Sequence, residues 1–165
     1  MGELIRILIR RFKIRGLKKA PLNLKFICMY SYKRMIRVQD TDATGVLYFA
    51  NQLQIGLEAF EDFLCTQGFS IGEMIKKKHY LLPIVHAEAD FFAPIHVSDI
   101  LELTLTFPKI GTTSFTHASE IFKKGKKVGT VKIVHVVYCP EKEEGIPIPE
   151  ELKSKILTCL ESKFL

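Results

Sequence analysis

The sequence lacks tryptophan, has only four cysteines, and contains no run of about 18 or more consecutive apolar residues. Without such a run we expect no membrane-spanning helix. The cysteines are far apart and form no Cys-x-x-Cys pair, which argues against a disulfide framework or a zinc site and favours isolated buried thiols. With no secretory signal ahead of them, they indicate a cytoplasmic protein. The four cysteines are Cys28, Cys65, Cys139 and Cys159.

The rest of the composition is typical of one globular domain. Of the 165 residues, 47% are hydrophobic and 25% are charged, which excludes disordered, collagen-like and disulfide-scaffold chains. The formal net charge is +6, but residues 1–28 hold eight basic residues and one acidic residue. The other 137 residues hold 16 basic and 17 acidic residues. The body of the protein therefore lacks the basic surface that nucleic-acid binding requires.

Residues 1–28 form a separate basic segment, in which Arg6, Arg10 and Lys13 have helical spacing among apolar residues. The segment fits an Arg-rich targeting sequence, although it contains no serine. It also fits an amphipathic helix that contacts an anionic membrane surface. A third interpretation is that translation begins at Met29, and we favour this one. The functional domain is then residues 29–165.

From residue 29 onward the hydrophobic pattern predicts an α+β domain. Leu53, Leu57, Phe60 and Leu64 recur at helical spacing and predict a long helix over residues 50–67. Only a sheet that wraps around this helix would bury the apolar stripe. The expected fold is therefore an antiparallel sheet of about five strands around one central helix.

The remaining elements follow from changes in the period of the pattern. The segment 127–139 is apolar on both faces and should lie centrally in the sheet. The turn Lys124-Gly125-Lys126 joins it to the preceding strand as an antiparallel hairpin. The expected strands are 32–38, 82–92, 100–107, 114–123 and 127–139, and shorter helices are expected over 71–78 and from Pro149 onward.

The chemically most informative segment is residues 39–51, which read QDTDATGVLYFAN. Asp40 and Asp42 precede Gly45, and the loop runs directly into the long helix. The first turn of a helix presents unpaired N–H groups and a partial positive charge, which suit an anion or a carbonyl that becomes one. A carboxylate beside it can act as a base or nucleophile, and glycine lets the backbone approach a ligand. An aspartate that simply caps the turn is an equally simple explanation.

This segment resembles the active-site signature of the 4-hydroxybenzoyl-CoA thioesterase family, whose members have the hotdog fold. The resemblance implies that Asp42 is the catalytic carboxylate and that the backbone N–H of Phe49 polarises the thioester carbonyl. It also implies substrate contacts from Gly45 and Tyr48, no cofactor and no metal. Family members assemble as dimers or tetramers with sheets joined edge to edge and active sites at the subunit boundary, so a homo-oligomer is expected.

Within this family the chain is most similar to the 1,4-dihydroxy-2-naphthoyl-CoA hydrolases of menaquinone and phylloquinone synthesis. Tyr48-Phe49 matches the start of their helix, and residues 82–96 match their strand signature L-P-x-V-H-A-x-x-D-F-F-A-P-x-H. The Tol-Pal-associated acyl-CoA thioesterases typically carry histidine where this chain has Phe49. Aromatic residues are available to enclose a naphthalene ring, namely Tyr48, Phe49, Phe91 and Phe92.

Several other residues are weaker candidates. His86 lies on the polar face of its predicted strand and could contact the substrate, whereas His96 is expected to be structural. His86, Glu88 and Asp90 share that face, but one strand rarely supplies a complete set of metal ligands. Glu58 is expected to be a supporting polar contact or a solvated residue. Possible contacts to the phosphates of coenzyme A are Lys123, Lys124 and Lys126 beside Lys127, although other family members place basic residues where this chain has Gly111 and Thr112.

Two other functions remain open from the sequence alone. One is a short-chain or aromatic acyl-CoA thioesterase of broad specificity. The other is a non-catalytic protein that contacts a membrane surface through residues 1–28. A hotdog dehydratase is disfavoured because its histidine is expected ahead of the helix, and residues 40–51 contain none.

Overall fold

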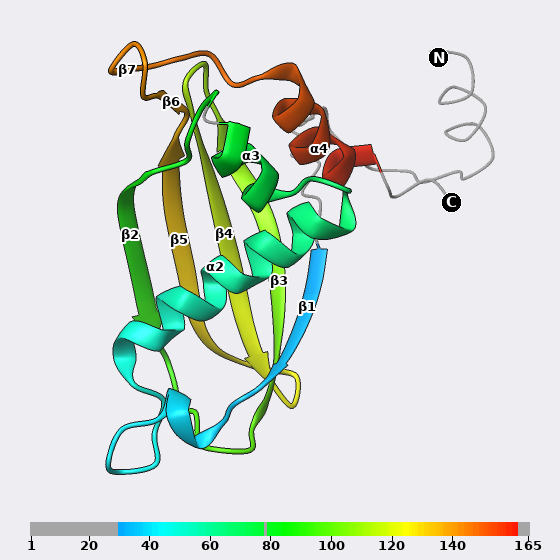
Figure 1. The fold of residues 1–165 in the computed structure, drawn as a ribbon. Helices are drawn as coiled ribbons and strands as arrows, with labels where there is room; N and C mark the ends of the chain where they lie inside the picture. The colour runs from blue at the N-terminus through cyan, green and yellow to red at the C-terminus, as the bar shows by residue number, and fades with distance from the viewer. Residues whose placement is uncertain (1–29, 78, 162–165) are drawn as a thin grey trace, which may run out of the picture.

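The computed structural model describes residues 30–77 and 79–161, with side chains described up to residue 157. The predictions for residues 1–28, and for Cys28 and Cys159, lie outside this part. Five antiparallel strands form one sheet in the order β1-β3-β4-β5-β2 (Figure 1). They are β1 (Tyr30–Met35), β2 (Ile84–Phe91), β3 (Ile100–Ile110), β4 (Ser114–Lys123) and β5 (Lys126–Val136).

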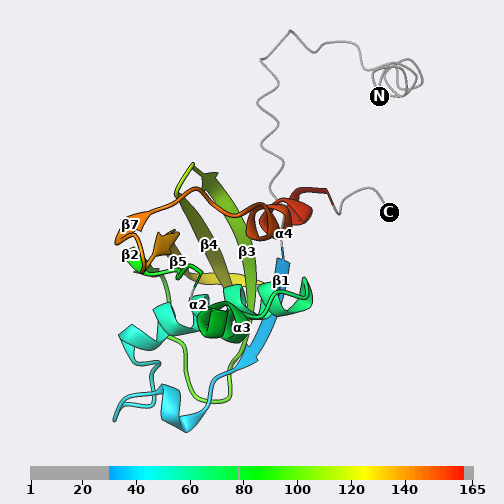
Figure 2. The same ribbon diagram turned by 45° about the horizontal axis from the view of Figure 1, so that its top comes forward.

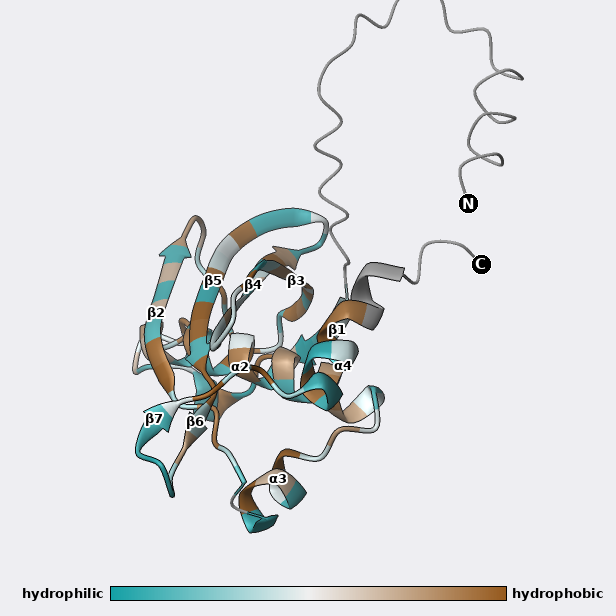
Figure 3. Ribbon diagram, turned by 90° about the horizontal axis from the view of Figure 1, so that it is seen from above, coloured by the Kyte–Doolittle hydropathy of each residue, from teal (hydrophilic) through white to brown (hydrophobic). Residues whose placement is uncertain are grey.

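The long helix α2 (Phe49–Thr66) lies against one face of this sheet. Seen from above, the strands form an arc around the helix (Figure 3). Gly56 is the point of closest approach, since a Cβ added there would lie 2.5 Å from Cγ1 of Val131 on β5. The predicted α+β domain, with one sheet wrapped around a central helix, is thus confirmed.

Shorter elements complete the fold. The helix α3 (Ile71–Lys77) follows α2 on the same side of the sheet (Figure 2). The helix α4 (Glu150–Glu161) starts directly after Pro149, as expected for a proline at a helix start. A 3₁₀ turn η1 (Val38–Asp40) follows β1, and β6 (Tyr138–Cys139) pairs with β7 (Glu144–Gly145). No helix in the described ranges is long and apolar enough to cross a membrane.

Some details differ from the predictions. The first strand ends at Met35, because the chain turns into η1 at Val38. The last predicted strand is divided into β5 and β6, and β5 is an interior strand while β4 is the middle one. Its hairpin turn contains two residues, Lys124 and Gly125, and both have positive φ, which suits a tight two-residue turn.

The buried stripe of α2 is also shifted from the predicted one. Phe60 and Leu64 are buried as expected, but Leu53 and Leu57 are only half-buried. The sheet instead covers Ile55, Gly56, Ala59 and Phe63. Among the cysteines, Cys139 is buried as predicted, whereas Cys65 is exposed.

Candidate active site

The loop between η1 and α2 carries the Asp-x-Asp motif and is held as a small hairpin. A β-bridge pairs Thr41 with Leu47, and the N–H of Asp42 donates to the carbonyl of Val46 at 2.9 Å. Gly45 closes the turn with φ of 77°, a conformation that favours glycine. The loop extends beyond the start of α2, away from the body of the domain (Figure 1).

Asp42 lies in this hairpin, and its carboxylate is exposed. Its Oδ1 atom accepts hydrogen bonds from the Thr44 hydroxyl at 2.6 Å and from the Thr44 N–H at 2.8 Å. These two bonds hold the pKa of Asp42 below its usual range, so the carboxylate is ionised at neutral pH. Asp42 therefore caps the turn while its carboxylate stays exposed to solvent.

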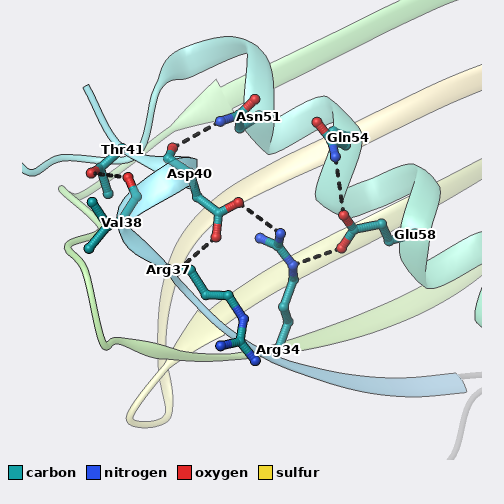
Figure 4. Close-up of polar contacts among 8 residues, drawn as sticks. All are labelled: Arg34, Arg37, Val38, Asp40, Thr41, Asn51, Gln54 and Glu58. Atoms are coloured by element: carbon teal, nitrogen blue, oxygen red, sulfur yellow. Dashed lines mark hydrogen bonds and ion pairs between the residues drawn. The ribbon is translucent and has the colours of Figure 1, made fainter.

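Asp40 is buried and ties the same loop to the helix (Figure 4). Its Oδ1 accepts from Nη2 of Arg34 at 2.9 Å and its Oδ2 from the N–H of Arg37 at 2.7 Å. Burial raises the pKa of Asp40, but the bonds from Arg37 and Arg34 outweigh it and leave this pKa lowered. Its backbone carbonyl accepts from the N–H of Tyr48 and from Nδ2 of Asn51, each at 2.9 Å. Asp40 thus fixes the loop relative to the first turn of α2.

Arg34 connects this network to a second carboxylate, that of Glu58 on α2. Its Nε atom lies 2.8 Å from Oε2 of Glu58, and Oε1 of the same carboxylate accepts from Nε2 of Gln54 at 3.3 Å (Figure 4). One guanidinium thus connects β1, η1 and α2. Glu58 is thus half-buried and paired with Arg34. No sequence pattern pointed to Arg34, because a single basic residue on a short strand carries no recognisable signal.

Tyr48 and Phe49 form the start of α2. Tyr48 is the N-cap and Phe49 is the first helical residue, so the N–H of Phe49 has no acceptor in a preceding turn of the helix. Their rings are 4.7 Å apart between centroids and both are exposed. Phe91 and Phe92, also exposed, line a shallow pocket together with Val46 from the Asp42 loop. The expected aromatic residues therefore gather near the loop, but within one chain they enclose no cavity.

The structure shows one apolar cavity that the sequence analysis did not anticipate. It has a volume of about 590 Å³ and lies between α2, α3, the segment before β2 and the end of β5. Its walls come from segments far apart in the chain, which is why no local pattern predicts it. The lining includes Leu57, Phe60, Met74, Ile75, Leu82 and His135.

His86 is exposed on β2, an edge strand of the sheet. Its Nε2 lies 3.1 Å from Oε2 of Glu88, and the other oxygen of Glu88 accepts from Lys132 at 2.9 Å. Asp90 accepts a hydrogen bond from Thr130 at 2.8 Å. The carboxylates on this face are thus engaged with side chains of the neighbouring strand β5.

A comparison with protein families relates this geometry to known enzymes. The family model described as the thioesterase-like superfamily matches residues 36–156, a range that includes the Asp42 loop, α2 and every strand of the sheet except β1. The chain belongs to this superfamily. The predicted hotdog thioesterase is therefore confirmed at the level of the superfamily and fold.

Individual members of the superfamily match over most of their length. A 1,4-dihydroxy-2-naphthoyl-CoA hydrolase of Microcystis aeruginosa is 36% identical over 122 residues, which cover 74% of this chain and 88% of that protein. The crystal structure of a 1,4-dihydroxy-2-naphthoyl-CoA thioesterase from Synechocystis superposes with a TM-score of 0.75 at 31% identity, covering 78% of this chain and 95% of that chain. A gentisyl-coenzyme A thioesterase superposes with a TM-score of 0.69 at 25% identity, covering 77% and 99%.

The lysines of this thioesterase-like protein differ in their surroundings. Lys123 donates to the carbonyl of Pro94 at 2.8 Å and to Asp99 at 2.9 Å, so its ammonium group is tied to the loop after β2. Lys127 pairs with Glu120 at 2.5 Å. Lys124 and Lys126 are exposed at the hairpin. Of the three predicted contacts to coenzyme A, Lys124 and Lys126 are the more accessible.

Proposed function

We propose that this protein hydrolyses 1,4-dihydroxy-2-naphthoyl-CoA to 1,4-dihydroxy-2-naphthoate and CoA, a step of menaquinone and phylloquinone synthesis. The observation that carries the proposal is the ionised Asp42 on a loop that Asp40 anchors to the first turn of α2. The relatives named as hydrolases of this thioester support the choice of substrate. We place the protein within the 4-hydroxybenzoyl-CoA thioesterase family on the motif in residues 39–51.

In this proposal the thioester carbonyl lies between Asp42 and the start of α2. Asp42 activates a water molecule that attacks the carbonyl and displaces the CoA thiolate, or Asp42 itself attacks the carbonyl and expels the thiolate to form a transient anhydride, which water then hydrolyses. The N–H of Phe49 donates to the developing oxyanion, at the positive end of the helix dipole. A positioned base contributes about 10²–10⁴-fold and one oxyanion donor about 10²–10³-fold. A thioester has a good leaving group, so these two groups suffice.

The proposed active unit is a homodimer or a larger homo-oligomer of the domain formed by residues 29–165. In one chain Asp42 faces solvent, and β2 is an edge strand with a row of unpaired backbone groups. Exposed apolar side chains cluster on and beside this edge, including Ile84, Val85 and Phe91. A second copy paired along β2 would cover them. The widely separated cysteines support a cytoplasmic location.

The test is hydrolysis by the full chain of a thioester panel containing 1,4-dihydroxy-2-naphthoyl-CoA, benzoyl-CoA and butyryl-CoA. We expect the naphthoyl thioester to have the highest kcat/KM. We also expect Asp42→Asn to lower kcat by at least about 10²-fold. The matched control is Asp62→Asn, another exposed carboxylate, on α2, which should retain the parental rate.

Two results would contradict the proposal. Equal kcat/KM values for butyryl-, benzoyl- and naphthoyl-CoA would favour a thioesterase of broad specificity. Near-parental activity of Asp42→Asn would move the catalytic role to another residue, with Glu58 as the first candidate.

A further inference from the structure

The apolar cavity of about 590 Å³ has the size of a small-molecule site, for which volumes of about 300–1,000 Å³ are usual. Its walls are aliphatic and aromatic side chains from α2, α3 and the segment before β2, among them Leu57, Ile75 and Leu82. Such walls favour a flat apolar group over a charged one. The cavity is open to solvent in the single chain, since Ile75 and Ile84 on its rim are exposed.

The polar side chains in the lining are Glu61, Tyr138 and His135, and the ring of His135 has a buried hydrogen-bonding atom to spare. His135 is only 2% exposed, and its Nδ1 lies 3.0 Å from the carbonyl oxygen of Leu82. A carbonyl oxygen can only accept, so Nδ1 carries the proton and Nε2 is an acceptor. Nε2 is buried and has no partner among the described residues. Burial lowers the pKa of His135, which keeps the ring neutral.

The orientation of this ring is fixed by its neighbours. The His135 ring is stacked at 5.1 Å from Phe60, at 5.2 Å from Phe115 and at 5.3 Å from His117. Rotation of the ring would also break the bond to Leu82. A buried acceptor without a partner is costly, and a ligand that donates a hydrogen bond removes that cost.

Resting on the proposed function, we propose that this cavity holds the naphthalene ring of the substrate and that Nε2 of His135 accepts a hydrogen bond from its 4-hydroxyl group. The 1-hydroxyl is adjacent to the thioester and can bond to the thioester carbonyl. The 4-hydroxyl lies on the opposite side of the same ring, away from the reacting carbon. It cannot bond to the thioester carbonyl and is therefore the hydroxyl group left to bond with the wall of the cavity. His135 is thus a specificity-determining residue for a hydroxylated aromatic acyl group.

The carboxylate that serves this cavity belongs to a second copy of the chain. Phe60 follows Phe49 by eleven residues, which is about 16 Å along the axis of α2, and the Asp42 loop lies beyond Phe49. An acyl group cannot span that distance within one chain. Strand β2 has Ile84 at the cavity end, paired with His135, and Phe91 at the end near the Asp42 loop.

An antiparallel pairing of β2 with its copy reverses these ends. The Phe91 end of one chain, with its Asp42 loop, then lies beside the Ile84 end of the other chain, with its cavity. A twofold axis at the middle of β2 creates two such sites. Each site combines the cavity and His135 of one subunit with Asp42 and the helix start of the other.

The experiment compares two substrates that differ only in the 4-hydroxyl group: 1,4-dihydroxy-2-naphthoyl-CoA and 1-hydroxy-2-naphthoyl-CoA. We expect the parent to prefer the former by about tenfold in kcat/KM, the effect of one buried hydrogen bond. His135→Phe keeps an aromatic ring and removes the acceptor, so the ratio should fall to about one.

The matched control is His117→Phe, because His117 stacks on the same Phe60 ring but does not line the cavity. It should retain the tenfold preference of the parent. A parent without preference, or a folded His135→Phe that retains the preference, would overturn the role of His135. A parent that hydrolyses neither naphthoyl thioester would instead refute the proposed function, and the inference would fall with it.

A second measurement applies even if His135→Phe does not fold. Ile75→Trp fills the mouth of the cavity from an exposed position on α3, whereas Lys76→Trp adds the same ring one residue away, outside the lining. Ile75→Trp should weaken binding of the product 1,4-dihydroxy-2-naphthoate by at least about tenfold, and Lys76→Trp should not. Equal affinities of the two variants and the parent would overturn the assignment of this cavity.

Discussion

Nη2 of Arg34 lies 2.9 Å from Oδ1 of Asp40, and this ion pair is nearly buried between β1, η1 and α2. The same aspartate receives the N–H of Tyr48, the N-cap of the helix, on its backbone carbonyl. The pair therefore joins the edge strand, the loop with Asp42 and the first turn of α2 in one hydrogen-bonded unit. The geometry of the proposed reaction depends on this unit, although neither residue of the pair needs to touch the substrate.

Asp40→Ala should therefore affect both stability and activity. It leaves the Arg37 N–H and part of the Arg34 guanidinium without this partner in a partly buried position. We expect a loss of about 3 kcal/mol in the free energy of unfolding, because removing one partner of a buried pair is strongly destabilising. The rate should also fall at a temperature where the variant is folded. Denaturant titrations and kcat measurements test both effects.

The control for this variant is Glu102→Gln, which removes the carboxylate from the exposed ion pair between Lys33 and Glu102. Exposed pairs contribute about 0–1 kcal/mol, so stability and rate should stay close to those of the parent. If Asp40→Ala were as stable and active as Glu102→Gln, the anchoring role of Asp40 would be wrong.

The pH dependence of the reaction should respond to Thr44. The hydroxyl and the N–H of Thr44 lower the pKa of Asp42, and Asp42 must be ionised to act as a base or nucleophile. The rate should therefore remain constant as the pH falls through the range where an ordinary aspartate would be protonated. Thr44→Val removes the hydroxyl, raises the pKa of Asp42 and should shift the acid limb of kcat/KM to higher pH. Thr41→Val, which removes a hydroxyl bonded to Val38 in the same loop, should leave the limb in place.

Much of the fold could be predicted because its signals are local. The period of the long helix, the proline before α4 and the tight hairpin at Gly125 each depend on neighbouring residues. The buried face of α2 was predicted less well. A curved sheet covers a wide sector of the helix, so Ala59 and Gly56 are buried while Leu53 is left at the flank. A pattern of large apolar residues cannot reveal a close approach that depends on a small one.

The candidate site also has one part that a local sequence pattern predicts and one part that it does not. The Asp42 motif is contiguous and could be recognised in the sequence. The apolar cavity is assembled from α2, α3 and β5, so it exists only in three dimensions. The available hint was His135, a polar residue on the face of β5 that otherwise carries Val131 and Ile133.

Gly56 should be required for the contact between helix and sheet. Gly56→Ala would place a methyl group 2.5 Å from Cγ1 of Val131, so α2 or β5 must move, at a cost of about 1–3 kcal/mol in the free energy of unfolding. Gly72→Ala in α3 is the matched control, because the nearest atom to its Cβ is 3.7 Å away. That substitution should stabilise the protein by about 0.5–1 kcal/mol. Thermal or denaturant unfolding gives both values, and equal effects would contradict the close approach.

Buried His117 should make the protein sensitive to acid. Burial, and secondly the charge that His135 carries once it is protonated, lower the pKa of His117 from 6.5 to about 3. Below pH 6.5 the unfolded chain binds a proton that the folded chain does not, so stability falls as the pH decreases toward about 3. The slope from this residue is at most about 1.4 kcal/mol per pH unit. His117→Phe should remove the contribution of His117 to this slope. His79→Gln, at an exposed position, should leave the slope unchanged. An unchanged slope in His117→Phe would refute the effect.

The proposed division of the site between two subunits predicts complementation between two impaired variants. Asp42→Asn lacks the carboxylate but has an intact cavity, and Ile75→Trp has the carboxylate but a filled cavity. A mixed dimer combines the intact cavity of the first chain with the intact Asp42 of the second. Random association at equal amounts yields about half mixed dimers, each with one working site, so about a quarter of the parental activity should return. The mixed dimers can be made by dissociating and then mixing the two purified variants, or by co-expressing the variants with two different affinity tags. Their thioesterase activity is then measured. If cavity and carboxylate worked within one chain, every mixed dimer would have one damaged part in each site. Activity would then not exceed that of the two variants assayed separately.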